Sequence, residues 1–304
     1  MNTLRIKRIK DELNDLFKNK LDDNNIFYEL NNDDIDILNV MMIGTKNTPY
    51  ENGFFFFTIQ YPDNYPSVPM IVWYYTTHSK MRFNPNLYNN GKVCLSIINT
   101  WGSQDNWTSA MNTRSVLLSI QSMVLNEYPL NNEPGLKITE KTITDYNNVL
   151  YYCVFNIGIL QNLKQEKKVY LQNKYSNKII SFECFRDRIN THFKNNIDWY
   201  INRCKELHFK FKNVQVFFTS PYENIKYSCN YLYILEELVN IYEKLTGNKL
   251  TNIFIPLDQI NLNKLTIVKL KKLCKKNKIK NYSRKNKEEI VNLILSKNEN
   301  ICFI

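Results

Sequence analysis

Four short runs of β-branched and aromatic residues follow one another between residues 26 and 75, separated by clusters of Asn, Asp, Gly and Pro. Such runs are typical of strands, and such clusters are typical of turns. Consecutive strands joined by turn-length gaps pair as an antiparallel meander. The sequence therefore predicts four strands: Ile26–Leu30, Ile35–Ile43, Phe54–Tyr61 and Met70–Tyr75.

Helical patterns flank these strands. Apolar residues recur at helical spacing over residues 4–17, 115–125, 144–163 and 182–207. Residues 77–109 show almost no periodicity, and a long irregular segment of this kind is more often functional than filler. The order of helix, four-stranded antiparallel meander, irregular segment and helices predicts an α+β fold in which the sheet rests on helices.

The later part of the chain has weaker patterns. Residues 209–218 look strand-like and 232–245 look helical, and two short helices are expected near 265–273 and 290–294. The predicted divisions are a core over 1–165, a helical extension over 166–215, a connecting segment over 216–260 and a small two-helix module over 261–304.

The residue types that build common cofactor and metal sites are scarce. Only seven glycines are present, and no two are spaced as in a GxGxxG or Walker-type phosphate-binding loop. The seven cysteines form no CxxC pair and there are three histidines, so a zinc ribbon or finger is not expected. The start is charged and lacks a signal-peptide pattern, which favours free thiols in a reducing compartment. The uncharged stretch Tyr146–Leu163 contains five Asn or Gln residues and predicts a buried helix, not a membrane span.

The positive charge is concentrated at one end of the chain. Residues 261–304 contain twelve Lys or Arg and three Asp or Glu, and so carry +9 of the formal net charge of +11. The rest of the chain is nearly neutral. The basicity therefore concerns targeting by the C-terminal part and not the chemistry of the core.

One string combines a nucleophile with a hydrogen-bond donor. Cys94 follows Asn86 by eight residues, and Gly91 provides a turn that can bring the two side chains to one surface. A thiolate can accept an acyl group, and an amide NH₂ beside the thioester can stabilise the oxyanion formed when an amine attacks. A small core residue is the alternative interpretation of Cys94. Hydrolysis of the cysteine-protease type is disfavoured because no histidine is linked to this motif.

These residues resemble the core of ubiquitin-conjugating enzymes over about residues 1–165. The resemblance rests on the turn Thr48–Gly53 and the strings Tyr61–Pro66, Asn84–Asn86 and Gly91–Leu95. Within that family, the subclass of the giant inhibitor-of-apoptosis conjugating enzyme is the most similar, through the strings 84–88, 99–101, 119–122 and 132–135 and the second tryptophan, Trp107. Residues 140–207 would correspond to its C-terminal extension. The resemblance also implies that the chain combines conjugating and ligase-like activity.

The resemblance assigns roles to individual residues. Cys94 would carry the C-terminus of ubiquitin as a thioester, and Asn86 would be the oxyanion-stabilising asparagine of the family's His-Pro-Asn motif. Asn84 replaces the motif histidine, which is chiefly structural in the family. Ser109 replaces a common proline, which disfavours ordinary RING-ligase docking. The other implied residues are Pro85, Tyr88 and Gly91 as motif support, and Asn131, Asn132 and Glu133 for orienting the acceptor lysine.

The implied partners are ubiquitin, an activating enzyme that consumes the ATP, substrate lysines and a ligase, with no metal, cofactor or membrane. There are two alternatives: a catalytically idle scaffold of the same fold, and a conjugating enzyme for another ubiquitin-like modifier. Retention of both Cys94 and Asn86 disfavours the idle scaffold. The expected location is the cytoplasm, the nucleus or both.

The basic C-terminal region resembles a SAP motif, a two-helix module often used to bind DNA. Basic residues between its two helices would neutralise phosphates, so binding would weaken steeply with salt. A solvated lysine-rich helical pair is the alternative. The candidate nucleic-acid contacts are Lys278, Lys280, Arg284, Lys285 and Lys287.

Overall fold

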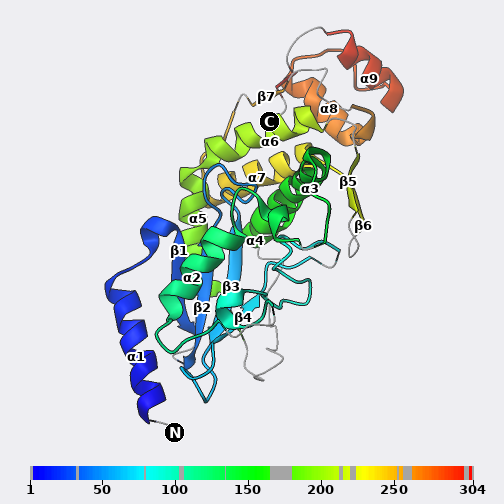
Figure 1. Cartoon of the computed structure of the whole chain (residues 1–304). Coiled ribbons are helices and arrows are strands. Elements are labelled where there is room, and N and C mark those ends of the chain that lie inside the picture. The colour runs from blue at the N-terminus through cyan, green and yellow to red at the C-terminus, as the bar shows by residue number, and fades with distance from the viewer. Residues whose placement is uncertain are drawn as a thin grey trace. The chain divides into compact units, whose positions relative to one another are not determined.

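The computed structural model describes residues 3–31, 34–78, 80–102, 106–133, 135–164, 180–211, 215–219, 224–251, 253–255, 262–297 and 301–302. The chain divides into two compact units, which are described separately: Met1–Thr191 with Phe217–Lys226, and His192–Val216 with Tyr227–Ile304 (Figure 1). The predicted division into 1–165, 166–215, 216–260 and 261–304 is finer than this and stays a prediction.

The first unit contains the predicted four-stranded antiparallel sheet, in the order β1-β2-β3-β4. Its strands are β1 (Ile26–Asn31), β2 (Asp34–Ile43), β3 (Phe54–Gln60) and β4 (Ile71–Tyr74). The meander is therefore confirmed. Helix α1 (Thr3–Lys18) precedes the sheet and buries Ile9, Leu13 and Leu16, as its apolar spacing predicts.

The two helices after the sheet begin two and four residues earlier than the apolar pattern predicts. Asn112 caps α2 (Thr113–Ser119), and Thr139 caps α3 (Glu140–Cys153), each with a reciprocal capping box. The polar first turns satisfy backbone N–H groups and contribute few apolar contacts, so apolar periodicity misses them. The remaining segments are η2 (Ser96–Ile98), the π-helical η3 (Ile120–Val124), η4 (Pro129–Asn132), the π-helical η5 (Val154–Gln161) and α4 (Asn162–Lys164).

Both faces of the sheet are covered, and β3 is buried along almost its whole length. On one face, Phe55 lies against η5, where a Cβ added to Gly158 would be 3.7 Å from its ring. On the other, Phe56 stacks on Phe182 at 4.8 Å between ring centroids, just before η6 (Glu183–Phe185). This explains why four consecutive phenylalanines can be buried in an antiparallel strand.

The predicted continuous helix over 182–207 is wrong. The chain forms η6, then α5 (Arg186–Asn195), and after Asn196 it forms α6 (Ile197–Lys210). Asn196 is not helical and ends one helix before the next begins. The predicted strand over 209–218 is only partly confirmed, because α6 extends to Lys210 and β5 spans Gln215–Thr219, while 212–214 lie outside the described residues.

In the second unit, α6 packs against α7 (Tyr231–Thr246), the predicted helix. Phe211 stacks on Tyr231 at 6.0 Å between ring centroids. The two predicted C-terminal helices are confirmed as α8 and α9. The other elements beyond β5 are β6 (Asn224–Ser228), β7 (Phe254–Ile255), η8 (Leu262–Lys264), α8 (Ile267–Lys276), α9 (Lys287–Leu295) and β8 (Ile301–Cys302).

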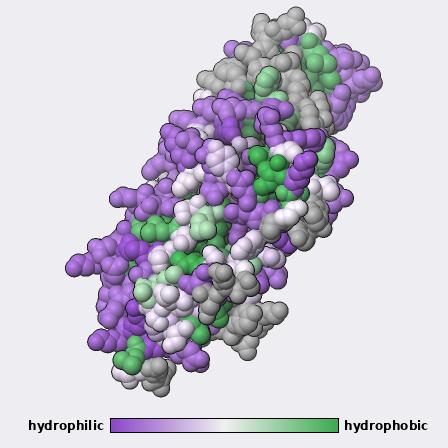
Figure 2. Space-filling view, viewed as in Figure 1, coloured by the Kyte–Doolittle hydropathy of each residue, from purple (hydrophilic) through white to green (hydrophobic). Residues whose placement is uncertain are grey.

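The face of the molecule drawn in Figure 2 is mostly hydrophilic, and apolar residues form small, separate patches on it. In the described part of the chain, no helix combines the length and the apolar character needed to cross a membrane.

Candidate active site

A short, tightly hydrogen-bonded loop presents Cys94. The backbone N–H of Tyr88 donates to Lys92 O at 2.9 Å, and the N–H of Cys94 donates to Asn86 O at 2.9 Å. Gly91 turns the chain between them with φ of +91°, and a Cβ there would lie 2.8 Å from Tyr74 O. Only glycine meets both requirements without displacing the neighbouring strand.

The structure brings Asn86 and Cys94 together, but the contact is not the one expected. The side-chain amide of Asn86 donates to the backbone carbonyl of Cys94, with Nδ2 and O 2.5 Å apart, and not to the thiol. Both residues are nearly buried, at 7% and 3% exposure. The amide therefore fixes the backbone beneath the thiol, and its second N–H remains as a donor for an oxygen that develops charge nearby.

Thr100 holds the thiol, which the sequence reasoning missed. Cys94 Sγ donates to the carbonyl of Thr100 at 3.0 Å, and the Thr100 hydroxyl accepts from Leu95 N at 2.8 Å. That hydroxyl also lies 3.0 Å from Val93 O. The thiol is therefore hydrogen-bonded to a backbone carbonyl. The only sequence signal was the resemblance around Asn99–Trp101.

Tyr88 lies directly beside the thiol. Its pKa is raised, first by partial burial and then by the neighbouring Cys94. The guanidinium of Arg82 lies 4.2 Å from the centre of the Tyr88 ring, and Lys92 Nζ lies 5.8 Å from it. Sequence reasoning assigned Tyr88 only as motif support and did not identify Arg82.

Asn84 is fully buried and forms several hydrogen bonds next to the Cys94 loop. Its Nδ2 donates to Val124 O at 2.9 Å, and its Oδ1 accepts from Asn86 N at 2.8 Å. Asn132 Nδ2 is 3.4 Å from the same Oδ1 and 2.7 Å from Met123 O. Asn84 and Asn132 therefore join the loop to the end of the following helix. The neighbouring Pro85 is also buried.

The other two residues expected at the acceptor side differ in their surroundings. Asn131 is exposed. Glu133 is partly buried, and this burial raises the pKa of its carboxyl, while the charge of Arg82 acts in the opposite direction. Glu133 also contributes to the raised pKa of Tyr88. Cys94, Tyr88, Arg82 and Glu133 therefore form one electrostatic group.

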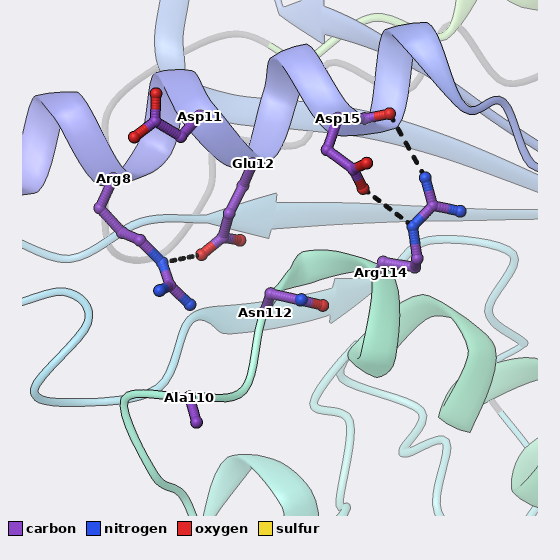
Figure 3. A pocket seen from close by; sticks show the side chains of 7 residues that line it. All are labelled: Arg8, Asp11, Glu12, Asp15, Ala110, Asn112 and Arg114. Carbon is purple, nitrogen blue, oxygen red and sulfur yellow. Dashed lines mark hydrogen bonds and ion pairs between the residues drawn. The ribbon is translucent and has the colours of Figure 1, made fainter.

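A pocket of about 280 Å³ lies between α1 and the start of α2 (Figure 3). Its charged groups are largely paired internally: Arg8 with Glu12, and Arg114 with Asp15 at 3.0 Å. Glu12 is 8% exposed and accepts hydrogen bonds from Thr113 N at 2.8 Å and from its hydroxyl at 2.7 Å. This buried carboxylate connects α1 to the first turn of α2. The residues that line the pocket therefore hold the two helices together. Ser109 lies exposed on the loop that leads to it.

Four of the five C-terminal candidates lie between α8 and α9, and Lys287 begins α9. Part of their charge is already paired. Lys287 Nζ donates to Asn263 O at 2.8 Å, and Lys285 Nζ lies 3.9 Å from a Glu289 carboxylate oxygen. Lys278, Lys280 and Arg284 are exposed. A pocket of about 280 Å³ between α7 and α8 has Lys269 paired with Glu236 in its wall.

Among the described residues, no group of three or more His, Cys, Asp or Glu could hold a metal ion. The expected absence of a metal or cofactor stays a prediction.

Residues 8–153 match the family model described as "Ubiquitin-conjugating enzyme". This part of the chain is a ubiquitin-conjugating enzyme domain. The conjugating domain contains the meander, the Cys94 loop and α3.

The chain is also similar to several named proteins. The chain is 38% identical over 181 residues to a putative ubiquitin-conjugating enzyme E2 38 of Arabidopsis thaliana, covering 56% of this chain and 54% of that protein. It is 43% identical over 122 residues to the human dual E2 ubiquitin-conjugating enzyme/E3 ubiquitin-protein ligase BIRC6, covering 38% of this chain and 2% of that protein. A crystal structure of a Plasmodium falciparum ubiquitin-conjugating enzyme E2 aligns with 30% identity over 40% of this chain and 97% of that one, with a TM-score of 0.34. The chain thus spans about half of the Arabidopsis relative and a small part of the human one.

Proposed function

We propose that this chain carries ubiquitin as a thioester on Cys94 and transfers it to a substrate lysine. The observation that supports this most directly is the hydrogen bond from the Asn86 side chain to the Cys94 backbone carbonyl. Both residues lie within the part of the chain that matches the family model. It supports the proposal because a thiol that can act as a nucleophile and an amide that can polarise a carbonyl lie in one loop.

The proposed mechanism is two acyl transfers. The Cys94 thiolate attacks the thioester carbonyl of ubiquitin held on an activating enzyme, which has consumed ATP, and the activating enzyme's thiolate leaves. A neutral lysine amine then attacks the new thioester; the C–N bond forms, the C–S bond breaks, Cys94 leaves as thiolate and the amine proton passes to solvent. The free N–H of Asn86 stabilises the oxyanion, a contribution of roughly 3 kcal/mol for such a donor.

Tyr88 and Glu133 border the place where the lysine amine arrives. Desolvation there lowers the pKa of the amine and increases its neutral, nucleophilic fraction. Ligase-like self-sufficiency, by which the chain would select its own substrates, is part of the proposal because of the likeness to the dual human enzyme.

The test is a charging assay with activating enzyme, ATP and labelled ubiquitin, analysed with and without reductant. The wild type forms a reductant-sensitive adduct, Cys94→Ser forms a reductant-resistant oxyester and Cys94→Ala forms none. An adduct in Cys94→Ala would disprove the assignment, and absence of any adduct in the wild type would favour an idle scaffold. Parallel reactions with other ubiquitin-like modifiers and their activating enzymes identify the modifier.

Asn86→Ala separates the two steps. Discharge to lysine should slow roughly a hundred- to a thousandfold while loading continues. Because the Asn86 amide also holds the Cys94 backbone, a melting curve is needed as a control. Equal loss of loading and discharge would indicate misfolding instead of a role at the oxyanion.

We further propose that the basic C-terminal module binds DNA. Its support is the +9 charge of residues 261–304 and the exposure of Lys278, Lys280 and Arg284. Double-stranded DNA should bind the full chain with an affinity that falls steeply as salt rises, and charge reversal at these three positions should weaken it. Salt-independent binding, or no binding, would contradict this proposal and leave the catalytic one untouched.

A further inference from the structure

Arg82 is held from two sides next to the active-site loop. Its backbone carbonyl accepts a hydrogen bond from the Tyr146 hydroxyl of α3 at 3.0 Å. Its guanidinium carbon lies 4.2 Å from the centre of the Tyr88 ring. Tyr146 is only 1% exposed, so its hydroxyl is a fixed point for the Arg82 backbone. The orientation of Tyr88 beside Cys94 therefore depends on a residue whose position α3 determines.

The charge of Arg82 acts on the same group of residues. It lowers the pKa of Glu133 and of Tyr88 against the raising effect of burial. Lys92, 5.8 Å from the Tyr88 ring, is a second cation on this side. An ammonium group approaching Cys94 is disfavoured by this positive charge, whereas a neutral amine is not.

Tyr146 is supported in turn by a segment from far along the chain. Its ring packs edge-on against Phe218 of β5, with centroids 5.0 Å apart and an interplanar angle of 75°. Phe218 is 2% exposed and lies beyond the residues that match the conjugating-enzyme family. A residue outside the matched domain is thus two contacts away from Arg82.

We propose that Arg82 is a positioning residue for transfer to lysine, which holds Tyr88 beside Cys94 and supplies positive charge where the acceptor amine arrives. Phe218 supports the position of Arg82 indirectly, because it packs against Tyr146, which donates a hydrogen bond to the Arg82 backbone. The proposal rests on the proposed function, because it concerns the second acyl transfer at Cys94.

The test measures single-turnover discharge of the full chain after charging, as the rate of thioester loss to free lysine at a series of pH values. Arg82→Gln should lower this rate about tenfold at neutral pH, since the Tyr88 ring loses its support. Its pH profile should also move to higher pH by about half a unit, because both the acceptor ammonium and the Glu133 carboxyl hold their protons more tightly without the cation. Arg82→Lys should restore the pH profile but only part of the rate, since an ammonium keeps the charge and loses the planar stack.

Tyr146→Phe tests the support with the smallest change. It removes one hydroxyl, and discharge should fall about threefold with no shift in the pH profile. Tyr200→Phe is the matched control, because it removes a hydroxyl from an equally buried tyrosine of the second unit. It should discharge like the wild type.

The outcomes separate the two proposals. Normal charging of the wild type with an unaltered discharge rate and pH profile in Arg82→Gln would overturn the role of Arg82 alone. Equal rates in Tyr146→Phe and wild type would overturn the bracing by α3. A wild-type chain that never becomes charged would overturn the proposed function as well.

Discussion

Two segments beyond residue 153 belong to the same unit as the conjugating domain, and they pack against different parts of it. Residues 180–191 cover the outer face of the sheet, where Phe182 and Phe185 lie against Phe56 at 4.8 and 6.5 Å between centroids. Phe218, in the second segment, packs against Tyr146 on α3. The first segment closes a hydrophobic core, and the second contacts the support of Arg82.

These two sets of contacts indicate that residues 180–191 act mainly on stability, whereas the segment containing Phe218 also acts on activity. The aromatic rings of Phe182 and Phe185 contact Phe56, and Phe182 also contacts Tyr75. The Phe218 contact leads through a hydrogen bond to Arg82 and then to Tyr88. Changes in the first segment should therefore lower the free energy of unfolding, and changes in the second should lower the rate of discharge.

Phe185→Ala should have the largest effect. Phe185 is 1% exposed, and truncating a buried phenylalanine costs about 3–5 kcal/mol through lost burial and the remaining cavity. Urea unfolding of the full chain should show this loss for the first unit. The discharge rate of the charged protein, measured at low temperature where it is still folded, should equal that of the wild type.

Phe209→Ala is the control for that change, because Phe209 is 61% exposed and its removal should alter stability by less than about 0.5 kcal/mol. If Phe185→Ala slowed discharge as much as it lowered stability, the two segments would not have separate roles.

Phe218→Ala should have the effect on discharge that Phe185→Ala lacks. It removes the edge-on contact with Tyr146, so discharge should slow about threefold even under conditions where the protein is fully folded. Phe218→Leu, which keeps apolar volume, should recover part of the rate. Phe217→Ala is the matched control: Phe217 is the adjacent residue and is 52% exposed, and Lys141 Nζ lies 5.4 Å from the centre of its ring. A wild-type discharge rate in Phe218→Ala would remove the distinction between the segments.

The sequence predicted the meander well because its strands are rich in β-branched and aromatic residues and are separated by strong turn residues. It did not predict the covering of the outer face, since Phe182 and Phe56 are brought together only by the folded chain. The break at Asn196 was missed for a related reason: asparagine is common throughout this chain, so a single one gives no signal.

The site was predictable to the extent that its chemistry is local. The spacing of Asn86 and Cys94 around Gly91 suffices to place them on one loop, and the structure does bring them together. The Thr100 carbonyl and the Arg82 guanidinium reach Cys94 and Tyr88 across an irregular segment, where no periodicity relates one position to another. Such contacts depend on tertiary packing.

Arg188→Ala should have the smallest effect and shows which interactions matter in the first segment. Arg188 lies 4.6 Å from the Phe27 ring centre and 3.5 Å from an Asp22 carboxylate oxygen, with both charged side chains 44% exposed. Exposed ion pairs and cation–π contacts each contribute about 0.5–1 kcal/mol or less, so the free energy of unfolding should fall by about 0.5–1 kcal/mol. The ionic part should shrink at high salt, and Arg188→Lys should recover most of the loss. A loss as large as that of Phe185→Ala, measured in the same urea titration, would mean that charge and not ring packing holds residues 180–191 on the sheet.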